Sequence, residues 1–170
     1  MKIVIFGLLV CALLLLTFSC NHITEPGAGF QWPYLNSFET GEDTTGWRGN
    51  GFFDLRDSAA PGGGSQSLFV AGGCPIPHAF YDLDIAGEEC ALQLRCWGKN
   101  LAIGGSVTLQ LVNNPSREIT ISITDTAWTF YESAQTLTCP SDDAVRITMN
   151  SGGYAPSSML VDLLEIVRVE

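Results

Sequence analysis

Cysteines are the residues of this chain whose type and spacing point most directly to chemistry. Beyond residue 20 there are four: Cys74, Cys90, Cys96 and Cys139. In an oxidising compartment, four thiols form two disulfides with three possible connectivities. Cys90 and Cys96 flank an alternating stretch and would lie about 20 Å apart in a strand, whereas a disulfide needs Cα atoms within about 4.4–6.8 Å. We therefore expect Cys74 to pair with Cys90 or Cys96, and the other of these two to pair with Cys139.

Few residues fit a zinc centre or a catalytic site. None of these cysteines forms a C-x2-C or C-x4-C pair, and His78 is the one histidine near them, which argues against zinc. A Ser-His-Asp arrangement would also have to use His78. Residues 62–65 lack the Gly-Lys-Ser/Thr ending of a phosphate loop, and no G-x-S-x-G turn occurs. The number of acidic residues does not exclude a carboxylate pair for glycoside hydrolysis. We nevertheless expect a non-catalytic protein.

Side chains on the polar faces of alternating strands are candidates for binding a ligand. A sugar presents C–H patches and hydroxyl groups, so it needs a flat aromatic ring with amide or guanidinium groups at its rim. Trp97 with Arg95, and Tyr131, have these types on faces predicted to meet solvent, and Gln110 is a further candidate. The alternative for Trp97 is a structural role, with its ring packed beneath a loop.

Alternation with a period of two residues dominates the chain beyond its N-terminal region. In residues 119–124, for example, isoleucines alternate with threonine and serine. Glycine- and proline-rich breakers separate such segments, and no window has the spacing of a long amphipathic helix. Nine or so short strands predict an all-β fold, a two-sheet antiparallel β-sandwich or jelly roll. The clearest strands are 67–71, 79–85, 90–99, 107–111, 119–124, 128–137, 145–150 and 160–169.

The last of these strands carries apolar residues in both phases. Val161 and Leu163 occupy one phase, while Leu164 and Ile166 occupy the other. This pattern predicts a strand inside the sheet, with both faces covered. Asp162 shares the phase of Leu164 and Ile166, so we expect it to point toward the core near its rim. It would need hydrogen-bonding partners there, because burying an unpaired carboxylate costs several kcal/mol.

The first twenty residues predict export. Lys2 precedes the apolar run 3–16, and small residues lead to Cys20, which is typical of a secretory signal peptide. The cysteine at the expected cut resembles the lipobox of bacterial lipoproteins, although Thr17 stands where that family usually has leucine. The resemblance implies that Cys20 becomes the first mature residue and carries diacylglycerol and an N-acyl chain. The alternatives are an ordinary cleaved signal and a single transmembrane helix, for which the run is short and lacks a basic flank.

These features predict a membrane-anchored lipoprotein of the bacterial cell envelope, in the outer membrane or on the surface if the organism is Gram-negative. Residues 21–30 would form a tether. The chain has 8 Lys and Arg against 18 Asp and Glu, a net charge of −10. Phosphate backbones and anionic lipid headgroups would repel it, so nucleic acid is not expected as a partner. Membrane contact should come through the acyl chains, while neutral or cationic ligands remain open.

Several short motifs, taken in their order and spacing, resemble carbohydrate-binding modules of the galactose-binding-like jelly-roll superfamily. The match covers most of residues 31–170. It consists of Asn36-Ser37-Phe38-Glu39 with Gly46-Trp47, then residues 64–70, residues 92–99, Trp128 with Tyr131, and Val161-Asp162. The resemblance implies a two-sheet antiparallel sandwich and, in many members, one structural Ca²⁺ ion.

The resemblance also implies which residues would hold that ion. Glu39 and Asp162 match positions that commonly supply carboxylates, and Ca²⁺ prefers six to eight oxygen ligands. The second aspartate often found after the one matching Asp162 is Leu163 here. The alternative is that Asp162 accepts backbone N–H bonds and that Glu39 is a solvated charge at a strand end.

Two functions follow from the sequence as hypotheses. The first is a non-catalytic, lipid-anchored domain of the cell envelope that binds a glycan or another neutral polymer. The second is a structural, adhesion or protein-interaction β-sandwich with no sugar ligand, because fold and function separate easily.

Overall fold

A computed structural model describes residues 30–49, 52–72, 78–85, 87, 89–152 and 156–169. The predicted signal peptide with Cys20, residues 21–29 of the predicted tether, and Cys74 lie outside the described residues. Within the described ranges, no helix has the length and apolar character needed to cross a membrane.

The regular secondary structure of the described residues is almost entirely β-strand, as the alternating pattern predicts. One short 3-10 helix, η1, covers Gly41–Thr44. The strands are β1 (Tyr34–Asn36), β2 (Arg48–Gly49), β3 (Phe53–Arg56), β4 (Ser67–Ala71), β5 (His78–Leu83), β6 (Cys90–Ala102), β7 (Gly105–Leu111), β8 (Glu118–Ile123), β9 (Thr129–Glu132), β10 (Leu137–Cys139), β11 (Val145–Ser151) and β12 (Ser158–Val169). Strands β1 to β3 are too short to show alternation, which is why the sequence did not reveal them.

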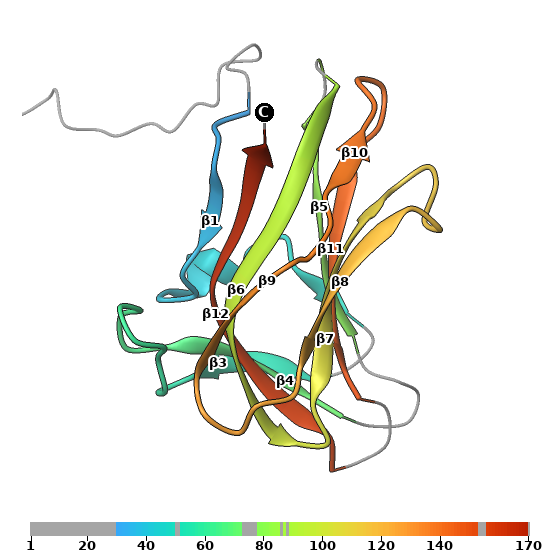
Figure 1. The fold of residues 1–170 in the computed structure, drawn as a ribbon. Coiled ribbons are helices and arrows are strands. Elements are labelled where there is room, and N and C mark those ends of the chain that lie inside the picture. The colour runs from blue at the N-terminus through green and yellow to red at the C-terminus, as the bar shows by residue number, and fades with distance from the viewer. Residues whose placement is uncertain are drawn as a thin grey trace, which may run out of the picture.

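Two antiparallel sheets face each other, with β6 and β12 in one layer and β11, β7 and β8 in the other (Figure 1). The seven-stranded sheet has β10, β6, β12, β4 and β3 as successive neighbours, while β1 pairs with β12 and β9 pairs with β6. The five-stranded sheet has the order β2-β5-β11-β7-β8. The predicted two-sheet antiparallel β-sandwich is therefore confirmed.

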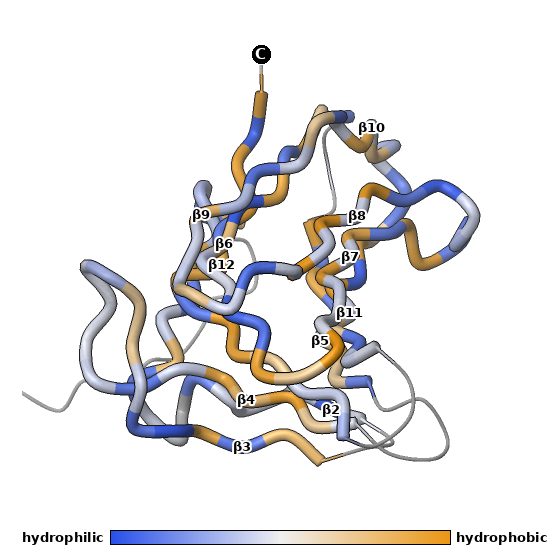
Figure 2. Tube along the Cα trace, turned by 60° about the horizontal axis from the view of Figure 1, so that its bottom comes forward, coloured by the Kyte–Doolittle hydropathy of each residue, from blue (hydrophilic) through white to orange (hydrophobic). Residues whose placement is uncertain are grey.

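The core lies between the two sheets, where each strand directs alternate residues. Leu92 and Cys96 of β6 and Ile147 of β11 are fully buried there, while hydropathy changes sign repeatedly along the strands (Figure 2). Burying an aliphatic side chain of this kind stabilises the fold by about 1.5–3 kcal/mol. At Gly98 the sheets come so close that an added Cβ would lie 2.5 Å from Cδ1 of Ile123, so this position of β6 has no room for a side chain.

Strand β12 lies inside its sheet between β6 and β4, as predicted, but Asp162 does not point toward the core. The register against β6 shifts between Asp162 and Glu165, and Leu163 in this bulge has a φ of 45°. Because a bulge reverses the alternation of side chains, Asp162 lies on the outer face with its partner Trp97, while Ile166 lies in the core. The predicted orientation of Asp162 is wrong for this reason. Because of the bulge, Val161 before it and Leu164 and Ile166 after it all point into the core, although they belong to different phases of the sequence.

The predicted strand 128–137 is divided into β9 and β10. Between them, Ser133 donates its N–H to the carbonyl oxygen of Leu94 at 2.9 Å, and its Oγ accepts the Leu94 N–H at 3.2 Å. The same Oγ donates to the carbonyl oxygen of Gln135 at 2.9 Å. The Ser133 hydroxyl thus accepts a hydrogen bond from β6 that a backbone carbonyl would accept in a regular strand, and the chain turns at this point. The apolar pattern of the sequence does not reveal this interruption.

Candidate functional site

The predicted ligand residues do not gather on one surface. Trp97 and Arg95 alternate with the core residues of β6, so both lie on the outer face of the seven-stranded sheet. Gln110 of β7 lies on the outer face of the five-stranded sheet, across the sandwich. Tyr131 is the cross-strand partner of buried Cys96 and packs against the core. Among these four residues, only Trp97 and Arg95 share a face.

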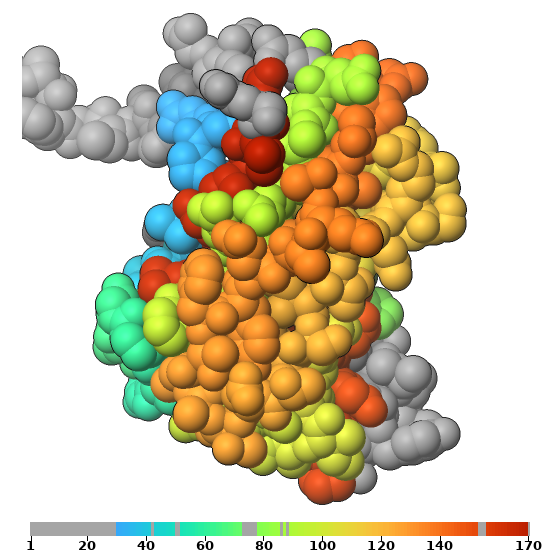
Figure 3. Space-filling model, viewed as in Figure 1, coloured from blue at the N-terminus to red at the C-terminus, as the bar shows by residue number. Residues whose placement is uncertain are grey.

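Phe130, which sequence reasoning missed, stands beside Trp97 in place of Tyr131. The two rings are cross-strand partners with centroids 5.9 Å apart in an edge arrangement, and Phe130 is 49% exposed. Tyr131 donates its hydroxyl to Oδ2 of Asp125 at 2.8 Å and accepts the Asp125 N–H at 3.0 Å. The segment around β9 forms much of the front surface in Figure 3. Each phase of this segment has an aromatic ring, and pairing with β6 decides which one faces outward.

Arg95 is held by neighbouring side chains of its own sheet. Its Nε lies 2.7 Å from Oε2 of Glu132, its Nη1 lies 3.8 Å from Oε2 of Glu165, and its Nη2 donates to Oε1 of Gln93 at 3.0 Å. These contacts link β6 to β9 and β12. Because partly exposed ion pairs contribute only about 0–1 kcal/mol each, their main effect is to fix the guanidinium. This position fits a structural role better than contact with a ligand.

The outer face of the five-stranded sheet carries polar side chains in cross-strand rows. We call it the outer polar face, and it consists of Arg48, His78, Phe80, Asp82, Ser106, Thr108, Gln110, Glu118, Thr120, Ser122, Arg146, Thr148 and Asn150. One row places Arg146 between Asp82 and Gln110. In the next row the hydroxyls of Thr108 and Thr120 lie 3.0 Å apart. The face therefore presents amide, hydroxyl, guanidinium and carboxylate groups around one phenyl ring.

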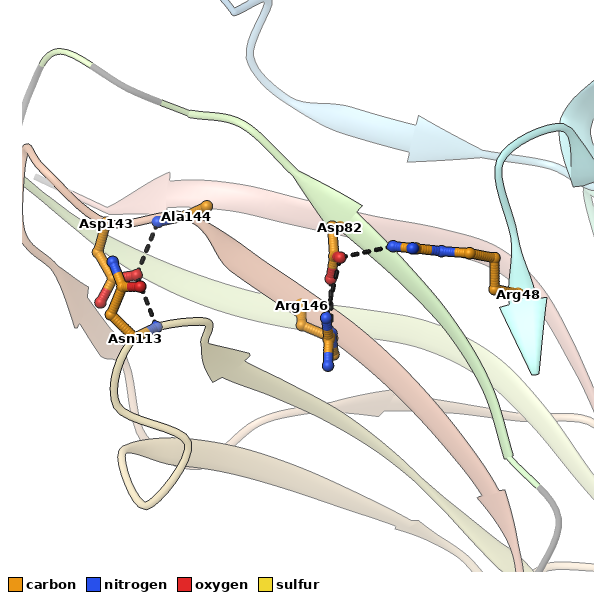
Figure 4. A network of polar contacts seen from close by, with 6 residues as sticks. All are labelled: Arg48, Asp82, Asn113, Asp143, Ala144 and Arg146. Carbon is orange, nitrogen blue, oxygen red and sulfur yellow. Dashed lines mark hydrogen bonds and ion pairs between the residues drawn. The ribbon is translucent and has the colours of Figure 1, made fainter. Parts of the chain in front are cut away.

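Arg48, Asp82 and Arg146 form an ion-pair cluster on this face (Figure 4). Oδ1 of Asp82 accepts from Nε of Arg146 at 2.6 Å, and Oδ2 accepts from Nη2 of Arg146 at 2.9 Å and Nη2 of Arg48 at 2.7 Å. The guanidinium carbons of Arg146 and Arg48 lie 4.7 and 4.9 Å from the ring centroid of Phe80. The hydrogen bond from Arg146, helped by both positive charges, holds the pKa of Asp82 below its usual value.

Two of the hollows that adjoin the outer polar face differ in chemistry. The first, of about 660 Å³, is lined by His78, Ser106 and Asn150 of the face and by Ile103 beyond it. Ile103 is 68% exposed. The second, of about 420 Å³, is lined by four aspartates, Asp82, Asp84, Asp142 and Asp143, together with Leu83, Val112, Asn113 and Ala144. The first hollow combines polar donors and acceptors with an apolar wall, whereas the second is strongly acidic.

Glu39, a predicted metal ligand, holds the loop of residues 60–66. Its Oε1 accepts the N–H groups of Gly64 and Gln66 at 3.1 and 3.2 Å, and its Oε2 accepts the N–H and Oγ–H of Ser65 at 2.7 and 3.2 Å. A Cβ at Gly64 would collide with this carboxylate, so the close approach requires glycine. These hydrogen bonds, led by the one from the backbone of Ser65, lower the pKa of Glu39.

Asp162, the other predicted metal ligand, reaches the same loop from beneath. It is fully buried, with Oδ2 accepting the Ala60 N–H at 2.8 Å and Oδ1 accepting the Leu163 N–H at 2.7 Å. A Cβ at Gly63 would meet this carboxylate. Burial raises the pKa of Asp162, and the nearby negative charge of Glu39 adds to the rise. The structure thus brings the two predicted carboxylates to one loop.

The donor set of Glu39 does not fit a calcium ligand in this geometry. A carboxylate has about four acceptor positions, and four N–H or O–H donors already point at Glu39. Across the described residues, no group of three or more His, Cys, Asp or Glu side chains is arranged to hold a metal ion. Glu39 instead acts as a loop clamp. Asp162 accepts backbone N–H groups, which was the alternative considered from the sequence.

The cysteines occupy positions that bear on disulfide formation. Cys90 and Cys96 lie six residues apart on the single strand β6. Both point into the sandwich, but their separation along an extended strand is too large for them to bond to each other. Strand β10 places Cys139 directly opposite Cys90. Among Cys90, Cys96 and Cys139 no disulfide is formed, and the predicted pairing of Cys74 lies outside the described residues. Desolvation raises the pKa of the Cys96 thiol to about 12.

No family model and no curated protein matches this chain. Solved structures of carbohydrate-binding modules share its fold. The CBM22-1 xylan-binding domain of Xyn10C from Paenibacillus barcinonensis is 20% identical, with a TM-score of 0.59 over 81% of this chain and 94% of that one. TmCBM61, solved with β-1,4-galactotriose, is 14% identical, with a TM-score of 0.55 over 79% and 95%. A family 16 carbohydrate-binding module is 19% identical, with a TM-score of 0.56 over 73% and 92%.

These comparisons define the class of fold. The chain has the two-sheet β-sandwich of carbohydrate-binding modules, and it spans nearly the whole length of these three neighbours. At 20% identity or less, the likeness concerns the fold, and any sugar site must be argued from the side chains of this chain.

Proposed function

We propose that this chain is a non-catalytic glycan-binding domain of the bacterial cell envelope, anchored by lipid on Cys20, and that its sugar lies along the outer polar face. The observation that carries the proposal is the first hollow. Polar residues, His78 and Asn150 among them, line this hollow together with the apolar Ile103. A pyranose ring offers the complementary surface, with hydroxyls at its rim and C–H groups on its faces.

The rest of the outer polar face extends this hollow in the way a glycan chain requires. Thr148 of β11 and the exposed Thr120 of β8 lie in the next row, and Gln110 adds an amide in the row beyond it. These groups hydrogen-bond hydroxyls without a charge requirement. The neighbours described as xylan-binding and as a galactotriose complex have the same fold, which supports a polysaccharide ligand. We expect a modest affinity, of about 4–8 kcal/mol, in the micromolar to millimolar range.

Binding to immobilised polysaccharides tests this function. We expect the purified domain to be retarded in affinity gels that contain xylan, β-1,4-galactan or a related neutral polysaccharide. Asn150→Ala and Gln110→Ala should weaken binding by about tenfold, because each removes an amide worth about 1.4 kcal/mol to a bound sugar. Gln66→Ala is the matched control and should bind as the parent does, because this amide lies just before β4 of the other sheet, where it donates to Asp57.

Two outcomes would contradict the proposed site. Retardation that survives Asn150→Ala and Gln110→Ala would place the sugar elsewhere. Loss of retardation in Trp97→Ala, with the other two variants unaffected, would move the site to the opposite sheet. Unfolding curves of all variants should coincide, which separates lost contacts from lost folding.

A second candidate function rests on the exposed aromatic pair on that opposite sheet. Phe130 is half-exposed beside Trp97, and aromatic side chains are enriched at protein interfaces. If the domain binds no polysaccharide, this pair favours the protein-interaction role considered from the sequence. Capture of an envelope protein by the parent domain, and not by Phe130→Ala, would support that role.

A further inference from the structure

The Arg48–Asp82–Arg146 cluster carries one more positive charge than its own carboxylate neutralises. Both guanidiniums form ion pairs with Asp82. For neither arginine does the described part of the chain supply a second carboxylate partner. This surplus stands on a protein whose net charge is −10, so the sign of the charge on the cluster differs from that of the molecule.

The two guanidiniums are held in place before any ligand arrives. Arg146 is fixed by two hydrogen bonds to Asp82 and is 34% exposed, while Arg48 donates one hydrogen bond and is 61% exposed. Both lie within 4.9 Å of the Phe80 ring centroid. A guanidinium has five N–H donors, so Arg48 keeps donors directed at solvent. Fixing the side chains beforehand lowers the entropy cost of binding an anion.

We propose that this cluster binds a sugar carboxylate, so that the ligand is a glycan carrying a uronic acid. The inference rests on the proposed function and specifies the substrate class of the same face. Arginine binds carboxylate in a bidentate manner that matches two parallel N–H groups. The sugar ring that bears the acid would lie beside Phe80, with its neutral neighbours running toward Gln110 and the first hollow.

The surrounding charges limit the ligand to isolated acidic units. The second hollow begins at Asp82 and is lined by further aspartates, including Asp84 and Asp143. Asp143 accepts the N–H groups of Asn113 and Ala144 at 3.1 and 2.8 Å (Figure 4). Consecutive uronates would meet these carboxylates and the negative charge of the whole protein. A mostly neutral chain with sparse uronic acid substituents fits both the cluster and its acidic border.

A titration with two small probes tests the inference. Methyl β-D-glucuronide and methyl β-D-glucoside differ in the carboxylate, and NMR amide shifts report where each binds. We expect both to perturb the outer polar face, and the glucuronide to bind about fivefold tighter at low salt, as suits a partly exposed arginine–carboxylate pair. The difference should shrink at about 0.5 M salt, where screening is strong.

Matched arginine variants then assign the effect. Arg48→Gln should bring the two glycosides to equal affinity, while retaining the parent's unfolding curve because Arg48 is an exposed residue of an edge strand. Arg56→Gln is the control, since Arg56 also stacks on a phenyl ring, 4.7 Å from the centroid of Phe69, but belongs to the other sheet. This variant should keep the fivefold difference.

Three results would overturn the inference. The first is equal affinity of the parent for both glycosides, which leaves neutral polysaccharide binding, and so the proposed function, intact. The second is a polyuronate such as polygalacturonate that binds tighter per site than the single glucuronide. The third is a glutamate-rich peptide that displaces the glucuronide at equal concentration, which would identify the ligand as protein. Failure of every sugar to perturb this face would remove the proposed function as well.

Discussion

Glu39 shows how one partly buried carboxylate organises a distant segment. It lies just after β1, yet it accepts hydrogen bonds from the consecutive residues Gly64, Ser65 and Gln66. Hydrogen bonds from backbone N–H to a charged acceptor are stronger than neutral ones. The loop that covers Asp162 therefore depends on a residue whose charge can be removed by acid.

We expect Glu39→Gln to destabilise the domain at neutral pH and to matter less in acid. The glutamine side chain keeps one acceptor oxygen, but its NH₂ group would replace the other and would face N–H donors of the loop. The pKa of Glu39 is lowered in the folded state, so its contribution is present above the unfolded glutamate pKa of about 4.3 and is lost as pH falls through the lower folded value. Thermal unfolding midpoints from pH 7 to pH 2.5 measure this, and the gap between parent and variant should begin to narrow below the unfolded pKa of about 4.3.

The effect of Ca²⁺ on the stability of the parent and of Glu39→Gln tests whether Glu39 is a metal ligand. Since donors fill the acceptor positions of Glu39, we expect the parent's unfolding midpoint to be the same in EDTA and in millimolar Ca²⁺. A midpoint that rises with Ca²⁺ in the parent and not in Glu39→Gln would identify Glu39 and Asp162 as metal ligands.

The contribution of the buried Asp162 to stability depends on pH in the opposite direction to that of Glu39. Its pKa is raised in the folded state, so its ionisation costs stability as pH rises through that value.

Single residues also show where sequence reasoning ends. Alternation correctly predicted that β6 buries Leu92 and exposes Trp97, because a period of two is a local property. It was wrong in placing Tyr131, and not Phe130, on the outward phase, since that phase depends on pairing with β6. The side of Asp162 was wrong because the bulge at Leu163 has no reliable local signal. Arg48 and Asp82, far apart in the chain, had no sequence signal as a pair.

At the scale of elements, the pairing of β6 with β10 decides among the disulfides. Cys90 and Cys139 are direct cross-strand partners, and both are buried. Residues opposite each other in an antiparallel pair have Cα atoms about 4.5–5.5 Å apart, within the range of a disulfide. Of the two connectivities left open by the sequence, this register favours Cys90 with Cys139 and Cys74 with Cys96.

We expect oxidation to join Cys90 and Cys139. With glutathione disulfide as oxidant, the two thiols lose two electrons and two protons, and two glutathione thiols form. Closing the intervening loop should stabilise the domain by up to about 4 kcal/mol, which a higher unfolding midpoint without reductant would show. Peptide mapping under non-reducing conditions identifies the pair. Cys96→Ser, as control, should keep the Cys90–Cys139 peptide, whereas a Cys74–Cys90 peptide in the parent would refute the assignment.

At the scale of the whole molecule, the predicted anchor and the proposed sugar face belong to separate parts of the chain. The outer polar face is built from β5, β11, β7 and β8 with Arg48 of β2, all of which follow the predicted tether in sequence. An anchored domain with modest affinity gains from being held near its ligand, because tethering raises the effective concentration. The predicted lipid on Cys20 would thus complement a weak glycan site.

Cys20→Ser tests this arrangement in a bacterial host. We expect the parent protein to fractionate with membranes and to incorporate an alkyne-labelled fatty acid, and the variant to lose the label. Stable anchoring requires more than one acyl chain, which diacylglycerol with an N-acyl group supplies. Cys11→Ser, inside the apolar run, is the control and should keep both properties. If the parent fractionated with membranes but carried no label, residues 3–16 would be acting as an uncleaved membrane segment and the lipid anchor would be wrong.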